Sequence, residues 1–191
     1  MRNLKVLLEY DGTRYSGWQI QKNARTVGGA FAEALADVAR ESPPIYAAGR
    51  TDAGVHAAAQ VVSFRLRSLL TTRDLLEKLN DRLPADINVL HVEPAPMEFH
   101  ARHSASARTY RYQVSRRRTA FGKRFVWWVR APIDVEVLKR SAQLIARAKD
   151  FRSFAEAGRD DDAEGTDPAS TRCRIHEAAW VEEKDLLVFR I

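Results

Sequence analysis

Cysteine is almost absent from this sequence, because Cys173 is the only one among 191 residues. A single thiol cannot form an internal disulfide, so the composition fits a reducing compartment, and we expect the protein in the cytoplasm. No run of 18 apolar residues occurs, which predicts no membrane-spanning helix and no membrane partner. Apolar residues nevertheless make up 45% of the chain, enough for a hydrophobic core.

Acidic residues are missing from one segment, residues 101–130. It holds nine of the 31 Lys and Arg and none of the 25 Asp and Glu, so the excess positive charge is concentrated there. Six aromatic residues are interleaved with these cations: Tyr110, Tyr112, Phe121, Phe125, Trp127 and Trp128. Cations neutralise phosphates and rings stack on unpaired bases, so the segment predicts an RNA surface that includes Arg116, Arg117 and Arg118. The alternative is a solvated basic hairpin whose aromatic residues face the core.

The first half of the chain alternates strand and helix patterns. Apolar periodicity predicts strands over 4–10, 45–48, 59–66 and 87–95, and helices over 27–40 and 71–83. Thr71 and Asp74 form a capping pattern for the second helix, and Pro84 ends it. The order β-α-β-β-α-β is that of a ferredoxin-like unit, with helices on one face of an antiparallel sheet.

The second half begins in the same way. We expect strands over 109–115, 124–129, 174–182 and 185–191, a helix over 134–150 and an acidic loop over 155–170. By analogy with the first half, a helix and a strand are missing, so we expect this half to be incomplete at its C-terminus. The prediction is an α+β protein with an N-terminal half over 1–104 and a truncated C-terminal half over 105–191.

Two motifs of other chemistries are incomplete. GTRYSG (12–17) has the glycine spacing of a P-loop, but Trp-Gln follows where Lys and Ser or Thr are required. An H-x2-H pair at 100–103 and a C-x2-H pair at 173–176 lie 70 residues apart and contain one thiol, which disfavours a zinc site. Nucleotide binding and metal binding therefore have little support.

Polar residues are concentrated in AGRTDAGVHA (48–57), between two predicted strands. Asp52 is the only carboxylate of this loop, so the loop alone cannot supply a carboxylate pair or a two-metal site. A neighbouring cation, Arg50, would keep Asp52 ionised and able to act as nucleophile or base. The alternative is a structural turn aspartate. For His56 we expect a structural role, with bonds inside the loop.

This loop and four other blocks resemble the TruA-type tRNA pseudouridine synthases. In chain order the blocks are EYDGTRYSGWQIQ (9–21), AGRTDAGVHA (48–57), LNDRLPADINV (79–89), FHARHSASARTYRY (99–112) and FRSF (151–154). The resemblance implies a pseudouridine synthase fold of two ferredoxin-like, RRM-like halves with antiparallel sheets. It also implies conversion of uridine to pseudouridine at positions 38–40 of the anticodon stem-loop of tRNA, by a homodimer without metal or organic cofactor.

Residue by residue, the resemblance assigns three roles. Asp52 matches the catalytic nucleophile, Arg50 the arginine that helps to hold the flipped nucleotide, and Tyr110 the tyrosine that packs against the target base. A strand segment that touches the tRNA matches five further residues: Phe99, His100, Ala101, Arg102 and His103. Base flipping explains why such a site needs a cation and an aromatic face beside its carboxylate.

The sequence departs from the family at two places. Gly28 stands where the family has a glutamine, and it is expected to cost its helix about 1 kcal/mol. The family also continues beyond residue 191 with a segment whose arginine pairs with the catalytic aspartate. The alternative function is therefore a catalytically impaired fragment or paralogue that acts as an RNA-binding module, although a pure binding module would need neither Asp52 nor its turn.

Overall fold

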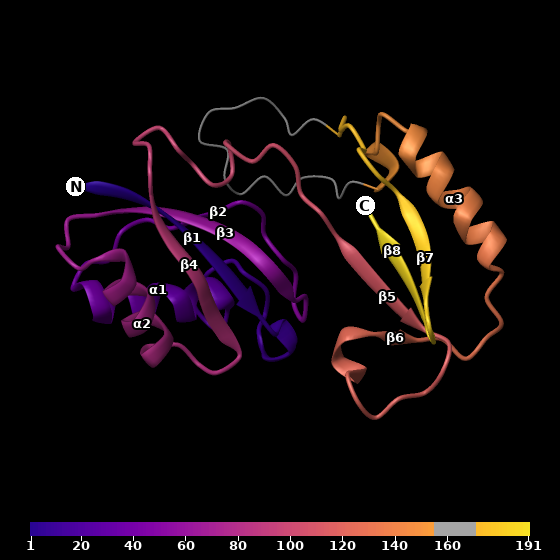
Figure 1. The fold of residues 1–191 in the computed structure, drawn as a ribbon, viewed down its shortest axis with the longest axis horizontal. Helices are drawn as coiled ribbons and strands as arrows, with labels where there is room; N and C mark the ends of the chain where they lie inside the picture. The colour runs from indigo at the N-terminus through magenta and orange to yellow at the C-terminus, as the bar shows by residue number, and fades with distance from the viewer. Residues whose placement is uncertain (155–170) are drawn as a thin grey trace. The chain divides into compact units, whose positions relative to one another are not determined.

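The computed structural model describes residues 1–154 and 171–191, and the chain divides into two compact units, Met1–Arg108 and Thr109–Ile191. Each unit contains one four-stranded sheet (Figure 1). The acidic loop predicted over 155–170 lies outside the described residues.

The first unit is the ferredoxin-like arrangement that the sequence predicts. Its elements are β1 (Arg2–Tyr10), a 3-10 turn η1 (Gly12–Arg14), α1 (Val27–Ala39), β2 (Tyr46–Ala47), β3 (Ala57–Leu66), α2 (Thr72–Arg82) and β4 (Ile87–Ala95). The strand order is β2-β3-β1-β4, and every pair is antiparallel. Figure 1 shows α1 and α2 side by side on one face of this sheet.

Alternation along β1 builds the core of this unit. Leu4, Val6 and Leu8 are fully buried because every second side chain of the strand points to the same face. From the neighbouring elements, Phe31 of α1 and Phe64 of β3 meet with ring centroids 6.0 Å apart. Each such fully buried side chain contributes about 1.5–3 kcal/mol relative to exposure.

The predicted capping pattern of α2 is confirmed. The backbone N–H of Asp74 donates to Thr71 Oγ1 over 3.0 Å, and the N–H of Thr71 donates to the Asp74 carboxylate over 3.3 Å. The Thr71 hydroxyl also donates to Asp74 Oδ2 over 2.7 Å, and this bond, followed by the bond from the Thr71 N–H, lowers the pKa of the Asp74 carboxyl. The helix ends at Arg82, just before Pro84, as the sequence predicts.

Gly28, in the first turn of α1, lies against the backbone of Trp18. Its N–H donates to the carbonyl oxygen of Trp18 over 3.0 Å, and an added Cβ would lie only 2.4 Å from that oxygen. Glycine lowers helix stability at this position, but only glycine leaves room for the close contact with Trp18.

The second unit is an α+β arrangement of its own. It comprises β5 (Arg111–Ser115), η2 (Lys123–Phe125), β6 (Trp127–Trp128), α3 (Val135–Arg147), η3 (Arg152–Phe154), β7 (Ala179–Glu183) and β8 (Leu186–Arg190). The strand order is β6-β5-β8-β7, and α3 lies alongside β7 (Figure 1). The β5–β8 and β7–β8 pairs are antiparallel as predicted.

Three element predictions in this unit need correction. The strand predicted over 124–129 is a 3-10 turn followed by two strand residues, which pair with β5 in parallel and not antiparallel. Gly122, at φ +67°, begins that turn and redirects the chain. The helix predicted over 134–150 ends at Arg147, because Ala148 is extended, and the strand predicted over 174–182 is ordered as a strand only from Ala179.

Candidate active site

The polar loop over 49–56 joins β2 to β3 in the first unit. The residue just before it continues the pairing of these strands, since the Ala48 N–H donates to Val61 O over 2.8 Å. The Gln60 side-chain amide donates to the carbonyl oxygen of Gly49 over 2.7 Å. Arg50 and Asp52 follow directly, and both are exposed. The sheet therefore fixes the base of the loop and leaves its two charged side chains accessible.

The middle of the loop is held by the segment that follows β1. The Trp18 N–H donates to Thr51 O over 2.9 Å, and the Gly54 N–H donates to Tyr15 O over 3.1 Å. The Tyr10 hydroxyl lies 2.8 Å from Thr51 Oγ1. Burial raises the pKa of Tyr10, so this phenol stays neutral. These bonds flank Asp52 on both sides and position its backbone without using its carboxylate.

Two glycines allow this close approach. A Cβ on Gly12 would lie 1.9 Å from Val55 O, and a Cβ on Gly17 would lie 2.6 Å from Thr51 O. Gly17 also has φ +88°, a conformation that favours glycine. The GTRYSG motif therefore has a clear structural use in this fold, as a glycine-bounded support for the polar loop.

Tyr15 fixes this supporting segment to the start of β4. Its hydroxyl donates to Asp86 Oδ1 over 2.5 Å, and the Arg25 guanidinium lies 4.7 Å from its ring centroid. Burial, followed by the bond to Asp86, raises the pKa of Tyr15 to about 12. The tyrosine is therefore a neutral donor throughout the physiological pH range.

His56, at the end of the loop, contacts two residues that follow β1. Its Nδ1 accepts from the Gly12 N–H over 3.1 Å and lies 3.1 Å from Asp11 Oδ1. The first contact needs an unprotonated Nδ1 and the second is favoured by a protonated one. In either state His56 links the end of the loop to the turn at η1.

Arg108 is a contributor that the sequence reasoning missed. Its Nε and a terminal nitrogen donate to the carbonyl oxygen of Ala48 over 2.8 and 2.5 Å, and the same terminal nitrogen lies 3.3 Å from Arg102 O. A Cβ on Gly49 would lie 3.4 Å from Arg108 Nε, so glycine leaves room for this contact. No local pattern marks this arginine, because it lies among cations that suggest phosphate binding.

The segment 99–103, expected as a strand, is a turn, and it packs beside β2 and β3. The buried Ala101 donates its N–H to Ser63 Oγ over 3.0 Å, and the Asn3 amide donates to Phe99 O over 2.8 Å. Phe99 is half-buried, whereas Arg102 and His103 are exposed. Within this segment, Ala101 thus supplies attachment to the sheet, and Arg102 and His103 supply accessible cationic or titratable groups.

His100 connects this segment to β2, next to the polar loop. Its ring centroid lies 4.4 Å from the ring of Tyr46 and 4.4 Å from that of His103. Its Nδ1 accepts from the Arg102 N–H over 3.2 Å. Burial, and then the charge of His103, lower the pKa of His100, which favours this neutral, accepting form.

The other predicted site residues belong to the second unit. Tyr110 is 59% exposed, and its backbone exchanges two hydrogen bonds with Ile191, over 2.7 and 3.1 Å. Arg116 pairs with Glu182 over 3.3 Å, and Arg117 pairs with Asp185 over 2.7 Å. Part of the positive charge of residues 101–130 is therefore balanced by acids of the β7–β8 hairpin.

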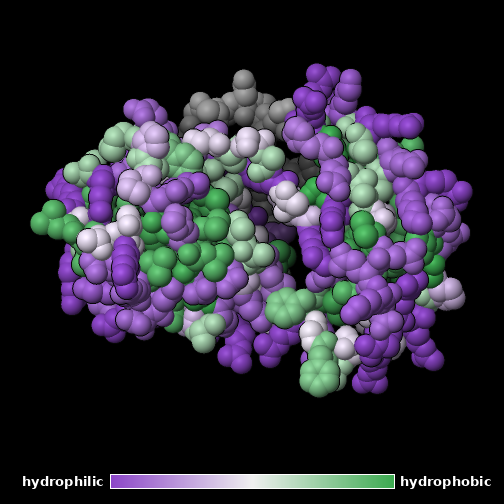
Figure 2. Space-filling view, viewed as in Figure 1, coloured by the Kyte–Doolittle hydropathy of each residue, from purple (hydrophilic) through white to green (hydrophobic). Residues whose placement is uncertain are grey.

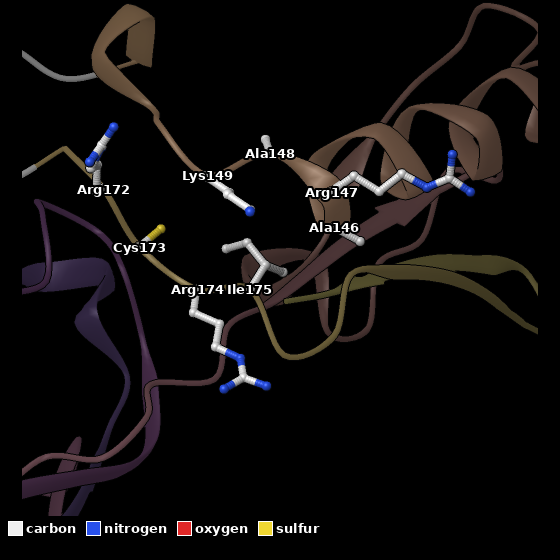
Figure 3. Close-up of a pocket in the computed structure, with 8 residues that line it drawn as sticks. All are labelled: Ala146, Arg147, Ala148, Lys149, Arg172, Cys173, Arg174 and Ile175. Carbon is white, nitrogen blue, oxygen red and sulfur yellow. The ribbon is translucent and has the colours of Figure 1, made fainter.

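A hollow of about 910 Å3 lies in the second unit after α3. Its lining residues, shown in Figure 3, are Ala146, Arg147, Ala148, Lys149, Arg172, Cys173, Arg174 and Ile175. Figure 3 shows the three arginine side chains extending in different directions, while the Lys149 amine points toward Ile175. The cations form a positively charged rim and do not converge on one point.

Residues 1–154 and 171–191 contain neither a metal-binding cluster nor a membrane-spanning helix. Over these ranges, no group of three or more His, Cys, Asp or Glu side chains is arranged to hold a metal ion. No helix there combines the length and the apolar character needed to cross a membrane.

Comparison with known proteins places the polar loop in a shared region. Residues 6–104 match the family model described as tRNA pseudouridine synthase. The chain is 45% identical to tRNA pseudouridine synthase A of Moorella thermoacetica over 160 residues, which cover 81% of this chain and 65% of that protein. It is 37% identical to the protein of the same name from Parabacteroides distasonis over 192 residues, covering 100% of this chain and 73% of the relative.

A third relative extends the same result. Identity to tRNA pseudouridine synthase A of Citrifermentans bemidjiense is 39% over 156 residues, which cover 81% of this chain. The match spans 62% of that relative, slightly less than two thirds of its length. The family-model match includes Arg50, Asp52 and the segment 99–103, whereas Tyr110 lies just beyond it.

Proposed function

This chain belongs to the tRNA pseudouridine synthase family, and from that premise we propose that it converts uridine to pseudouridine in tRNA. The observation that carries the proposal is the polar loop: hydrogen bonds from neighbouring segments fix its backbone around Asp52, while the side chains of Arg50 and Asp52 stay exposed. A rigid support for an accessible carboxylate is what a reaction at the sugar of a bulky substrate requires.

The substrate and the product are isomers, so the reaction needs no oxidant and no co-reactant. The N1–C1′ bond breaks and a C5–C1′ bond forms. C5 loses its proton and N1 gains one, so the atoms balance. In our proposal the Asp52 carboxylate acts at the sugar as nucleophile or base while the uracil turns. Tyr110 packs against the freed base, which an aromatic face holds without fixing one orientation.

A paired or stacked uridine must leave the helix before Asp52 can reach it. We assign Arg50 to the flipped nucleotide. Its guanidinium would contact the RNA backbone and occupy the space that the flipped base leaves in the base stack, which offsets part of the free-energy cost of flipping. The segment 99–103 and the arginines over 116–118 are assigned to the tRNA outside the target base. From the family resemblance, we propose uridines 38–40 of the anticodon arm as targets, and a cytoplasmic homodimer as the acting form.

The test is direct. The purified chain is incubated with tRNA that carries 5-tritiated uridine, and tritium release is measured because formation of the C5–C1′ bond displaces the hydrogen on C5. A tRNA with cytidine at positions 38–40 is the matched control and should release nothing. Release from the first tRNA alone supports the proposal. Tight tRNA binding without release would instead identify an RNA-binding module.

A further inference from the structure

Four aromatic side chains lie on one face of the sheet of the second unit. Tyr112 of β5 and Trp180 of β7 are both paired with Phe189 of β8, and residues directly opposite one another in antiparallel strands share a face. The rings of Trp180 and Phe189 are 5.2 Å apart. Trp127 of β6 completes the row, because its ring lies 6.4 Å from that of Tyr112 in an edge-on arrangement.

The half of this row on β5 and β6 is open to solvent. Tyr112 is 52% exposed and Trp127 is 59% exposed, whereas Trp180 and Phe189 are partly buried. Tyr110 extends the exposed part, because its backbone pairs with Ile191 in continuation of β5, and residues two apart on a strand lie on the same face. Residues two apart on a strand are separated by about 7 Å, so Tyr110 and Tyr112 are neighbours on this face.

The charge around these rings favours a polyanion over an apolar protein surface. Residues 109–130 contain seven Lys and Arg and no acid. Arg118, Lys123 and Arg130 form no ion pair with any other described residue. Phe121, just before η2, is 91% exposed. Figure 2 shows hydrophobic groups among hydrophilic ones on the surface of the second unit. Exposed rings among cations bind single-stranded nucleic acid through stacking and phosphate contacts together.

We propose that Tyr110, Tyr112 and Trp127 form a stacking platform that binds unpaired bases of the RNA next to the base under reaction. This proposal rests on the proposed function, which already places Tyr110 against the target base. Aromatic residues on four-stranded sheets stack two or three bases in RNA-recognition motifs, and stacking tolerates any base sequence. The sequence marks these rings only as members of a basic, aromatic segment, and their common face depends on the pairing of β5 with β6 and β8.

The test compares alanine variants on the two faces of the sheet of the second unit. Tyr112→Ala and Trp127→Ala should each weaken binding to the tRNA, and to an unstructured oligouridine, about tenfold. Trp128→Ala is the matched control, since Trp128 is the next residue, is also exposed and points to the opposite face. Trp127→Phe keeps a ring and should retain most of the affinity.

Salt titration separates stacking from charge. The slope of log K against log salt should be unchanged in Tyr112→Ala and Trp127→Ala, because neither loses a phosphate contact. A reduced slope, or equal losses for Trp127→Ala and Trp128→Ala, would overturn the platform. If an alanine variant unfolds on thermal melting, Tyr112→Leu keeps the apolar bulk without a ring, and it should show the same loss.

Two further outcomes are informative. Unchanged RNA affinity together with a changed mass by light scattering would show that this face joins copies of the chain, and the platform would be wrong. Tritium release by the unmodified chain is measured in parallel. Release with no effect of the ring variants overturns the platform alone, whereas ring-dependent binding without release supports the platform and overturns the proposed function.

Discussion

Arg108 donates two N–H groups to the carbonyl oxygen of Ala48, over 2.8 and 2.5 Å, where β2 leads into the polar loop. The arginine lies in the segment richest in positive charge, yet its guanidinium is directed to the backbone of the protein itself. We infer that Arg108 is a positioning residue. It fixes the backbone at Ala48, and this backbone sets the position of Asp52 four residues later.

Replacing Arg108 with alanine should loosen the start of the loop. We expect faster amide exchange over residues 48–52 and a rate constant for pseudouridine formation at least tenfold lower, with KM nearly unchanged, because a small displacement of a reacting group is costly. Arg65→Ala is the control, since Arg65 also donates to a backbone carbonyl, that of Met97. Equal effects of the two variants on exchange would contradict a specific role for Arg108.

Replacing Asp52 with asparagine should abolish pseudouridine formation and leave tRNA affinity within about twofold. Loss of a negative charge cannot weaken contacts with phosphates, whereas loss of the carboxylate removes the nucleophile or base. Asp81→Asn, at an exposed position on α2, is the charge-matched control and should keep full activity. Residual turnover by Asp52→Asn would show that another group carries the reaction.

Alanine at Gly17 should destabilise the first unit more than alanine at Gly54. Both glycines have positive φ, +88° and +79°, so either substitution costs about 1–2 kcal/mol in backbone strain. Only at Gly17 does the added Cβ meet an atom, Thr51 O at 2.6 Å, while nothing lies within 4 Å at Gly54. Urea unfolding of the two variants measures the difference, and equal midpoints would show that the loop moves aside freely.

Releasing an arginine from its acidic partner should strengthen tRNA binding. Asp185→Asn frees Arg117 from a 2.7 Å ion pair, so the slope of log K against log salt should steepen by up to about one. Asp37→Asn makes the same charge change beside Arg82 in the first unit and is the control. An identical gain from both variants would indicate a general charge effect and not a contact of Arg117.

Order in the segment 99–104 should decrease in acid. The folded state lowers the pKa of His100, mainly through burial, so the unfolded chain binds this proton first as the pH falls. Neutral His100 therefore makes its full contribution to folded-state stability at pH values above its ordinary pKa of 6.5. This contribution is lost as the pH falls below that value. Amide exchange at Arg102, which donates to His100 Nδ1, should be faster at pH 5.5 than at pH 7.5 after correction for the intrinsic rate. His100→Gln should remove this difference.

Local patterns were sufficient for the first unit. Alternating burial along β1, the Thr71–Asp74 capping box and the stop before Pro84 all depend on residues close in sequence, and the structure has each of them. The roles predicted for Asp52 and Arg50 came from the family resemblance, because the hydrophobic pattern alone does not indicate them. In such regions, local propensity and tertiary packing favour the same structure.

Long-range contacts explain what the sequence did not reveal. Arg116 and Glu182 are 66 residues apart, and nothing near either residue indicates their pairing. The contact of Arg108 with Ala48 spans 60 residues. Trp127 and Trp128 follow a pattern typical of strands, but the turn at Gly122 determines that their pairing with β5 is parallel. Tertiary geometry, and not propensity, decides these features.

The supports of the polar loop come from many parts of the first unit, so the order of the loop depends on the stability of that unit as a whole. Bonds from Tyr10, Tyr15, Trp18, Gln60 and Arg108 reach a stretch of only seven residues, 48–54. The loop cannot open as an independent fragment without breaking contacts to several elements, so it belongs to the same cooperative unit as the sheet. Thermal inactivation should therefore coincide with melting of the first unit, and residual activity should report the fraction of that unit still folded.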